Sequence, residues 1–67
     1  MYFRVKMKKV LKETEKARLI QFDFDEKWIP KSASDVLNNE TTLRLKGWFF
    51  KKNWHWLSKT TYVKEYG

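Results

Sequence analysis

Tyr2-Phe3-Arg4-Val5-Lys6-Met7-Lys8 alternates apolar and basic side chains from Phe3 onward, and this stretch decides the expected fold. Successive side chains of a strand point to opposite faces of the sheet, so strict alternation predicts a half-buried strand. The alternation slips at Val10, which is apolar where a charge is due. We therefore expect one strand over 2–11, with a bulge near Lys8-Lys9 that restores its register.

The same pattern predicts three further strands, at 17–24, 27–30 and 41–46. Pro30 cannot donate a ladder hydrogen bond, so it ends its strand or lies on an edge, and Gly47 ends the strand over 41–46. Between these strands, the Ser32 to Asp35 spacing is a weak helix-capping signal. We expect a single helical turn there, ending at Asn38-Asn39.

The segment 48–57 fits a period of two residues as well as a period of 3.6, because short aromatic runs cannot be assigned by periodicity alone. We expect a short helical turn at 48–52, followed by an extended stretch. The β-rich end, 60–67, is either a last strand or a frayed end.

These elements predict a mainly β fold: a small SH3-like or OB-like barrel of four to five short strands with one short helical turn. Residues 1–67 form a single domain in this interpretation, and closure into a barrel hides strand edges. A chain this short has a thin core, so most large aromatic side chains should be structural. The expected core is Phe3, Val5, Leu19, Ile20, Phe22, Trp28, Ile29, Leu43 and Leu45.

Composition argues against an enzyme. The chain contains no Cys, so it can form no disulfide and has no Cys nucleophile, and its single His, His55, is too few for a His/Cys zinc site and lies between two Trp. Asp23, Asp25 and Glu26 are close in sequence but fall in a turn, where acids are usually solvated. We therefore expect no catalysis, no cofactor and no metal. No signal peptide or membrane span is visible in the sequence, which makes the cytoplasm the default location and excludes a membrane partner.

The charge is strongly basic and unevenly distributed. Fifteen Lys and Arg face eight Asp and Glu, a formal net charge of +7. Both ends, 1–18 and 41–67, are basic, whereas 19–40 is acidic. This pattern favours a negatively charged partner, with nucleic acid the leading candidate.

Two features indicate where nucleic acid would bind. The segment 46–56 places aromatic rings among cations, as in proteins that bind single strands by stacking bases and holding phosphates. The outward row Arg4, Lys6 and Lys8 is the second feature, although Lys on a strand also serves as edge protection. Burial of the rings in the core is the rival interpretation of 46–56, and we expect at least one side chain of 54–56 to be exposed. The expected nucleic-acid-binding residues are Arg4, Lys6, Lys8, Arg44, Lys46, Lys51, Lys52, Trp54 and Trp56.

The stretch Lys16-Ala17-Arg18-Leu19-Ile20, followed by Trp28-Ile29-Pro30-Lys31-Ser32 and then by Trp48-Phe49, resembles small uncharacterised proteins carried by phages and other mobile elements. The resemblance covers 14–54, and its one specific motif is Trp28 to Ser32. It implies a small β-rich phage-type protein and no particular activity. The chain departs from the pattern in its aromatic end, at 54–56, and in its extension to Gly67.

A weaker similarity links 46–52 to the aromatic-basic segment of cold-shock domains, as an analogy of physics rather than of ancestry. The sequence thus favours a non-catalytic domain that binds nucleic acid, single-stranded and with weak sequence preference. The alternative is a phage-type accessory protein that binds or inhibits a host protein through its exposed aromatic segment. A homodimer formed through exposed aromatics is the third interpretation.

Overall fold

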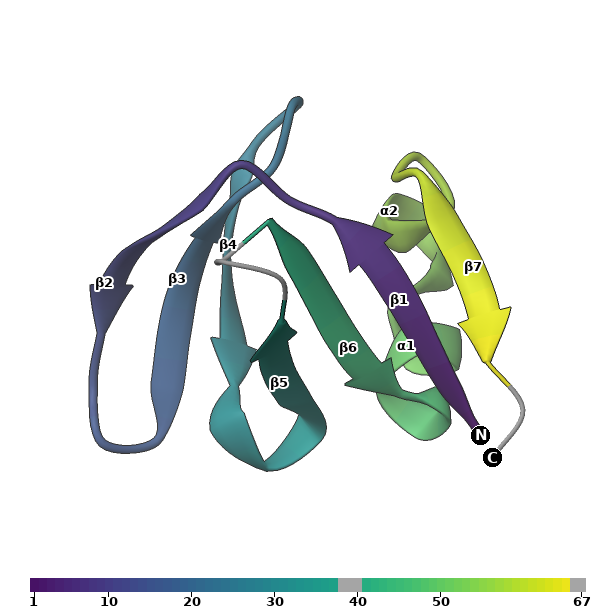
Figure 1. The fold of residues 1–67 in the computed structure, drawn as a ribbon, viewed down its shortest axis with the longest axis horizontal. Coiled ribbons are helices and arrows are strands. Elements are labelled where there is room, and N and C mark those ends of the chain that lie inside the picture. The colour runs from purple at the N-terminus through teal and green to yellow at the C-terminus, as the bar shows by residue number, and fades with distance from the viewer. Residues whose placement is uncertain (38–40, 66–67) are drawn as a thin grey trace.

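The computed structural model describes residues 1–37 and 41–65, which form two antiparallel sheets and three short helices (Figure 1). Sheet A has four strands in the order β5-β6-β1-β7, and sheet B has three in the order β2-β3-β4. The strands are β1 (Tyr2–Lys6), β2 (Lys9–Glu13), β3 (Ala17–Gln21), β4 (Glu26–Pro30), β5 (Ser34–Leu37), β6 (Thr42–Lys46) and β7 (Tyr62–Glu65). The helices are the 3-10 helix η1 (Lys31–Ala33), α1 (Gly47–Lys52) and α2 (Trp54–Leu57).

The expected first strand, 2–11, is two strands that belong to different sheets. β1 ends at Lys6 and β2 begins at Lys9, so the position expected for a bulge is a crossing between sheets. Backbone hydrogen bonds join the crossing to the residue before β6 of sheet A and to β3 of sheet B. The Met7 N–H donates to the Thr41 carbonyl at 3.1 Å, and the Lys8 N–H donates to the Gln21 carbonyl at 2.8 Å. The irregular register within β2 lies further on, between Val10 and Lys12.

The mainly β class is confirmed, and the expected strands at 27–30 and 41–46 correspond to β4 and β6. The strand expected at 17–24 ends earlier, at Gln21, and 62–65 is a last strand. Seven strands occur among the described residues, rather than four to five, because 2–11 divides and two further segments pair with sheet A. The SH3-like or OB-like barrel type stays a prediction.

The helical turn expected at 32–39 is wrong over most of its length. η1 supplies three residues of helix, but 34–37 is strand β5, in which Ser34 pairs with Leu45 and Val36 with Leu43. Backbone pairing with β6 outweighs a weak capping signal, and Val36 has the β-branched shape that strands favour. The expected end of the turn, Asn38-Asn39, lies outside the described residues.

The helix expected at 48–52 is confirmed as α1, but the extended stretch expected after it is the second helix, α2. Gly47 begins α1 where the chain passes close to the N-terminus, since a β-carbon there would lie 3.1 Å from the Met1 carbonyl oxygen. Asn53 turns the chain between the helices. Its Nδ2 donates to the Phe49 carbonyl at 3.0 Å, and its Oδ1 accepts from the Trp56 indole at 3.2 Å.

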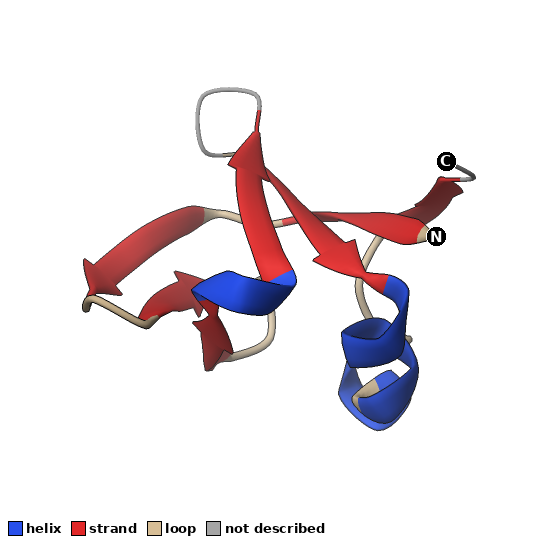
Figure 2. Cartoon of the chain, turned by 90° about the horizontal axis from the view of Figure 1, so that it is seen from below, coloured by secondary structure: helices blue, strands red, loops and turns tan. Residues whose placement is uncertain are grey.

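The core lies between the sheets and under the helices. Figure 2 shows α1 and α2 on one side of the β1–β6 pair. That side of sheet A carries Phe3, and the Phe3 ring stacks on Phe50 of α1 with centroids 3.9 Å apart. Of the nine expected core residues, seven are buried, Leu19 is half-buried, and Trp28 is wrong because its side chain is 51% exposed. Trp28 alternates with the fully buried Ile29, so the two side chains lie on opposite faces of sheet B.

The Trp28 to Ser32 motif has a structural role in joining sheet B to η1. The Lys31 N–H donates to the Lys16 carbonyl at 2.8 Å, and its ammonium pairs with Glu13 at 2.5 Å. That ammonium holds the pKa of the Glu13 carboxyl below its usual value. Through these contacts of Lys31, the motif fixes the turn between β2 and β3. Its tryptophan, Trp28, is not packed in the core.

The Phe3–Phe50 stack predicts a sharp contrast between neighbouring aromatic residues of α1. Phe50 is 1% exposed, so Phe50→Ala should cost about 3–5 kcal/mol of stability, enough to unfold a small domain. Trp48 is 56% exposed, and Trp48→Ala should change stability by roughly 0.5 kcal/mol. Chemical denaturation followed by circular dichroism measures both. Equal losses in the two variants would contradict the placement of α1 against sheet A.

Candidate nucleic-acid interface

Four of the expected cations share the face of sheet A that points away from the core, here called the basic face. The register pairs Arg4 with Arg44, Tyr2 with Lys46, and Lys6 with Thr42. Side chains of directly opposed residues lie on the same face, and residues two apart on a strand follow them. Arg4, Lys6, Arg44 and Lys46 are therefore neighbours on this face.

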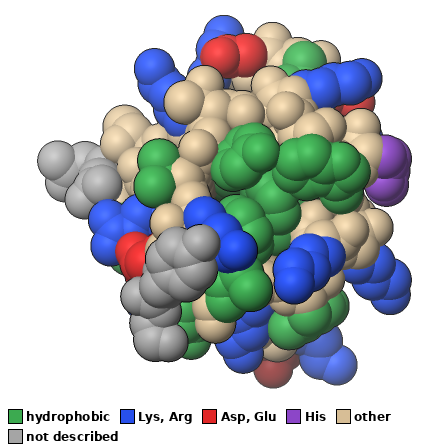
Figure 3. All heavy atoms as spheres, turned by 90° about the vertical axis from the view of Figure 1, so that its right-hand side faces the viewer, with side chains coloured by type: hydrophobic (Ala, Val, Ile, Leu, Met, Phe, Trp, Pro, Cys, Tyr) green, Lys and Arg blue, Asp and Glu red, His purple; other side chains and the backbone are tan. Residues whose placement is uncertain are grey.

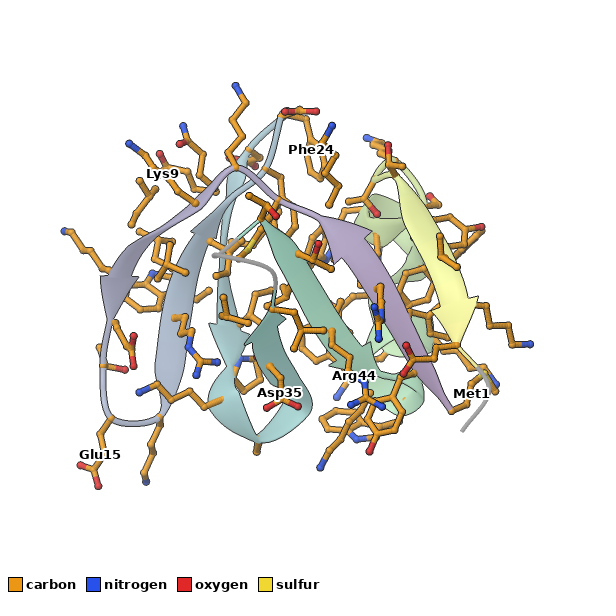
Figure 4. All side chains as sticks on the ribbon, in the orientation of Figure 1. Met1, Lys9, Glu15, Phe24, Asp35 and Arg44 are labelled. Atoms are coloured by element: carbon orange, nitrogen blue, oxygen red, sulfur yellow. The ribbon has the colours of Figure 1, made fainter. Side chains whose placement is uncertain are left out.

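Two carboxylates also lie on the basic face, and one of them binds both arginines. Glu65 on β7 accepts from Arg4 Nε at 2.5 Å and pairs with Arg44 Nη2 at 2.8 Å. Asp35 lies opposite Arg44 on β5 (Figure 4), and no ion pair joins it to another described residue. The face thus carries four cations against two acids. Among the described residues, Lys6 and Lys46 make no ion pair.

The Arg44 side chain is held from a second direction. Its guanidinium carbon lies 3.9 Å from the centroid of the Tyr2 ring, a cation–π contact. Its Nε is buried and has no hydrogen-bond partner. Stacking and ion pairing together fix the orientation of Arg44 while leaving one of its donors unused.

An open hollow of about 470 Å³ lies beside Lys6 at the β7 side of the basic face. Its lining combines two cations, three threonines and two valines: Arg4, Val5, Lys6, Thr41, Thr42, Thr61 and Val63. The volume falls in the range of small-ligand pockets, about 300–1,000 Å³. Cations and threonines suit an anionic ligand, and the Val63 side chain supplies an apolar wall.

Lys8 departs from the expected row. The alternation places it beside Arg4 and Lys6, but β1 ends at Lys6 and Lys8 lies in the crossing to sheet B. Its ammonium is 3.9 Å from Asp23. The row is therefore two residues long, because the strand that would have continued it changes sheet.

The aromatic-basic segment lies on the other side of sheet A, on the helices. Trp48, Lys51 and Lys52 are exposed on α1, at spacings of three and four residues that share one helical face, and His55 is exposed on α2. Trp54 is 49% exposed, and its ring contacts Tyr62 of β7 with centroids 5.8 Å apart. The structure therefore separates the two halves of the expected site, with β7 at the edge between them.

Figure 3 looks onto this edge and shows apolar side chains gathered there, with Lys and Arg around them. Two hydrophobic side chains of β7 are exposed at this edge. The Tyr62 side chain is 38% exposed and the Val63 side chain is 66% exposed. Val63 lines the hollow on the basic face, while Tyr62 contacts Trp54 on the helix side. The edge strand β7 thus connects the two surfaces.

Trp56 belongs to the core, so the expectation that it stacks on a base is wrong. It is 9% exposed, its ring packs edge-on against Phe22 with centroids 5.5 Å apart, and its indole donates to Asn53. Lys27 covers the ring at 5.4 Å from its centroid. The helix α2 turns Trp56 inward and Trp54 outward, whereas the expected extended stretch would have put both on one face. The prediction that at least one of 54–56 is exposed is confirmed by Trp54 and His55.

Sequence reasoning missed two exposed tryptophans, Trp28 and Trp48. The helical spacing from Trp48 to Lys51 and Lys52 could have indicated the second. The described residues contain no group of three His, Cys, Asp or Glu side chains placed to hold a metal. No helix in the described part of the chain is long and apolar enough to cross a membrane.

No protein-family model matches this chain, and no curated protein and no solved structure matches it either. A functional proposal for this protein therefore rests on its own geometry and charge.

The different environments of the four tryptophans predict how their fluorescence responds to iodide. Three are half-exposed and Trp56 is buried, so quenching should show one protected component. Trp56→Phe should remove that component, while Trp54→Phe should leave it and reduce the accessible part. A protected component that persists in Trp56→Phe and disappears in Trp54→Phe would reverse the assignment.

Proposed function

We propose that this domain binds single-stranded nucleic acid, without catalysis and with weak sequence preference, across the edge formed by β7. The observation that carries the proposal is the position of β7 between the two expected half-sites. Val63 shares the hollow with Arg4 and Lys6, and Tyr62 contacts Trp54. A strand lying over this edge reaches phosphate-binding cations on one side and an exposed ring on the other.

The phosphates would bind the basic face. Alternate cations on a strand are about 6–7 Å apart, a spacing near that of phosphates along a single strand. Lys6 and Lys46 are free of ion pairs among the described residues, and Lys6 lines the hollow together with Arg4. Contacts of this kind carry no sequence information, which accounts for the proposed weak preference.

The bases would stack on the helix side. Every base has a π-face, so an exposed ring binds bases with little selectivity, at ~1–3 kcal/mol per base. Trp54 is an exposed tryptophan whose ring contacts Tyr62 of β7, and no acidic residue occurs from 41 to 64. Lys51 and Lys52 remain in the proposed site as cations beside this ring, and Trp56 does not. The proposal keeps the small SH3-like or OB-like barrel as the fold type that presents these surfaces.

The exposed apolar side chains at β7 favour a second candidate, a phage-type accessory protein that docks on a host protein. Trp54, Tyr62 and Val63 are exposed together, and an apolar patch of this kind can be a protein-binding hot spot. The four cations of the basic face are the reason that we rank it second. Binding to nucleic acid is steeply salt-dependent, whereas binding at an apolar hot spot is not.

Two classes of variant test two separate contributions to binding of a labelled oligothymidine, measured by fluorescence anisotropy over a range of salt. Trp54→Ala should weaken binding by ~1–3 kcal/mol with little change in the salt slope, because it removes stacking. Lys6→Ala should reduce the slope by roughly 0.7, because it removes one phosphate contact on a single strand.

The matched controls lie on sheet B, whose strand β2 is at the opposite end of the molecule from β7 (Figure 1). Trp28 is as exposed as Trp54, and Lys12 is exposed like Lys6. Trp28→Ala and Lys12→Ala should leave affinity and slope close to those of the unaltered protein. Absence of binding at low salt would remove nucleic acid as the partner and favour the protein-binding candidate.

A further inference from the structure

Arg4 and Arg44 converge on a single carboxylate, which gives the basic face a ready-made anion site. Arg4 Nε and Arg44 Nη2 approach different oxygens of Glu65, at 2.5 and 2.8 Å. Arginine presents a planar fork of donors that fits phosphate as well as carboxylate. The two guanidinium groups therefore already hold the arrangement that a phosphate group would need.

We propose that Arg4 and Arg44 form a phosphate clamp that Glu65 occupies in the free protein, and that a backbone phosphate of the nucleic acid displaces Glu65 on binding. This inference rests on the proposed function. It adds a group of the protein itself, the Glu65 carboxylate, that competes with the nucleic acid for the two arginines. The ligand class is the phosphodiester group, and the competing group is a side chain of the same chain.

One contact holds the Arg44 half of the clamp in place independently of Glu65. The Arg44 guanidinium stacks on Tyr2, and that contact does not involve the carboxylate. Arg44 Nη2, which meets Glu65 at 2.8 Å, is the donor that a phosphate oxygen would take over, whereas Arg44 Nε is buried. Removal of Glu65 from the site would leave both arginines on neighbouring strands of the same sheet face.

Displacement of Glu65 exchanges one set of charged contacts for another. The Arg4, Arg44 and Glu65 side chains are 47%, 31% and 25% exposed, so solvent screens both ion pairs in part, and a phosphate oxygen would restore to the arginines the contacts that Glu65 gives up. Glu65 lies near the end of the edge strand β7, which pairs with β1 alone. The proposed nucleic-acid path crosses the same strand, so the ligand and the competing carboxylate meet at one place.

The test compares Glu65→Gln with Asp35→Asn in oligothymidine binding at several salt concentrations. Both variants gain the same charge on the same face, and Asp35 lies opposite Arg44 without pairing with it in the described structure. Glu65→Gln should bind about fivefold more tightly than Asp35→Asn, the factor that corresponds to ~1 kcal/mol. Its salt slope should be steeper by roughly 0.7 for each phosphate gained.

Arg44→Lys keeps the charge and removes the fork, so the advantage of Glu65→Gln should vanish in an Arg44→Lys background. Equal affinities of Glu65→Gln and Asp35→Asn would overturn the clamp while leaving the proposed function in place. Absence of binding by all of the variants and by the unaltered protein would overturn the proposed function and the clamp together.

A measurement on the unaltered protein keeps the clamp falsifiable if Glu65→Gln fails to fold. The chain has three arginines, so its Nε–H region in a nitrogen-correlated NMR spectrum contains three signals, of which Arg18 on sheet B is an internal control. Saturation with oligothymidine should shift the Arg4 and Arg44 signals and leave that of Arg18 in place. Stationary Arg4 and Arg44 signals at saturation would overturn the clamp.

Discussion

The stack of Phe3 on Phe50 is the contact on which the rest of this structure depends. It joins β1 to α1 and fixes which face of sheet A is covered by helices. A domain of 67 residues without disulfides has little other means of holding its layers together, so large aromatic contacts carry much of its stability. Because side chains alternate along a strand, burial of Phe3 and Val5 obliges Arg4 and Lys6 to face outward. The packing that stabilises the fold therefore also creates the basic face.

The edge strand β7 gives the two exposed surfaces a common border. On one side it contributes Val63 to the hollow beside Lys6, and on the other it contributes Tyr62 to the contact with Trp54. Glu65 from the same strand neutralises part of the basic face through two partly exposed ion pairs. A ligand that crosses β7 would exchange those ion pairs for contacts to its own phosphates. The proposed binding path and the proposed competitor thus follow from one structural element.

Alternation in the sequence predicted the facing of β1 and β6, because a period of two residues leaves little choice once one face is buried. It could not predict where the chain leaves one sheet for the other, since Met7 and Lys8 continue the same pattern through the crossing. In β5, pairing with β6 determined the secondary structure. Val36 pairs with Leu43 there, although the sequence upstream carries a helix-capping signal. Of the expected site residues, four cations lie on one face of sheet A and Trp54 is exposed on α2, whereas Lys8 lies in the sheet crossing and Trp56 is buried. Trp28 was assigned to the core on size alone, although its neighbour Ile29 fills that position.

Photo-crosslinking to an oligonucleotide that carries 5-iodouracil tests the central claim, that a nucleic-acid strand lies across β7, most directly. The side chains of Trp54 and Trp28 are nearly equally exposed, at 49% and 51%. Trp54 lies on α2 and Trp28 on strand β4 of sheet B, so solvent accessibility alone would give the two residues equal crosslinking yields. Our account predicts crosslinks at Trp54 or Tyr62, which diminish as salt is raised, and none at Trp28. Crosslinks centred on Trp28, or equal yields at Trp28 and Trp54, would contradict it.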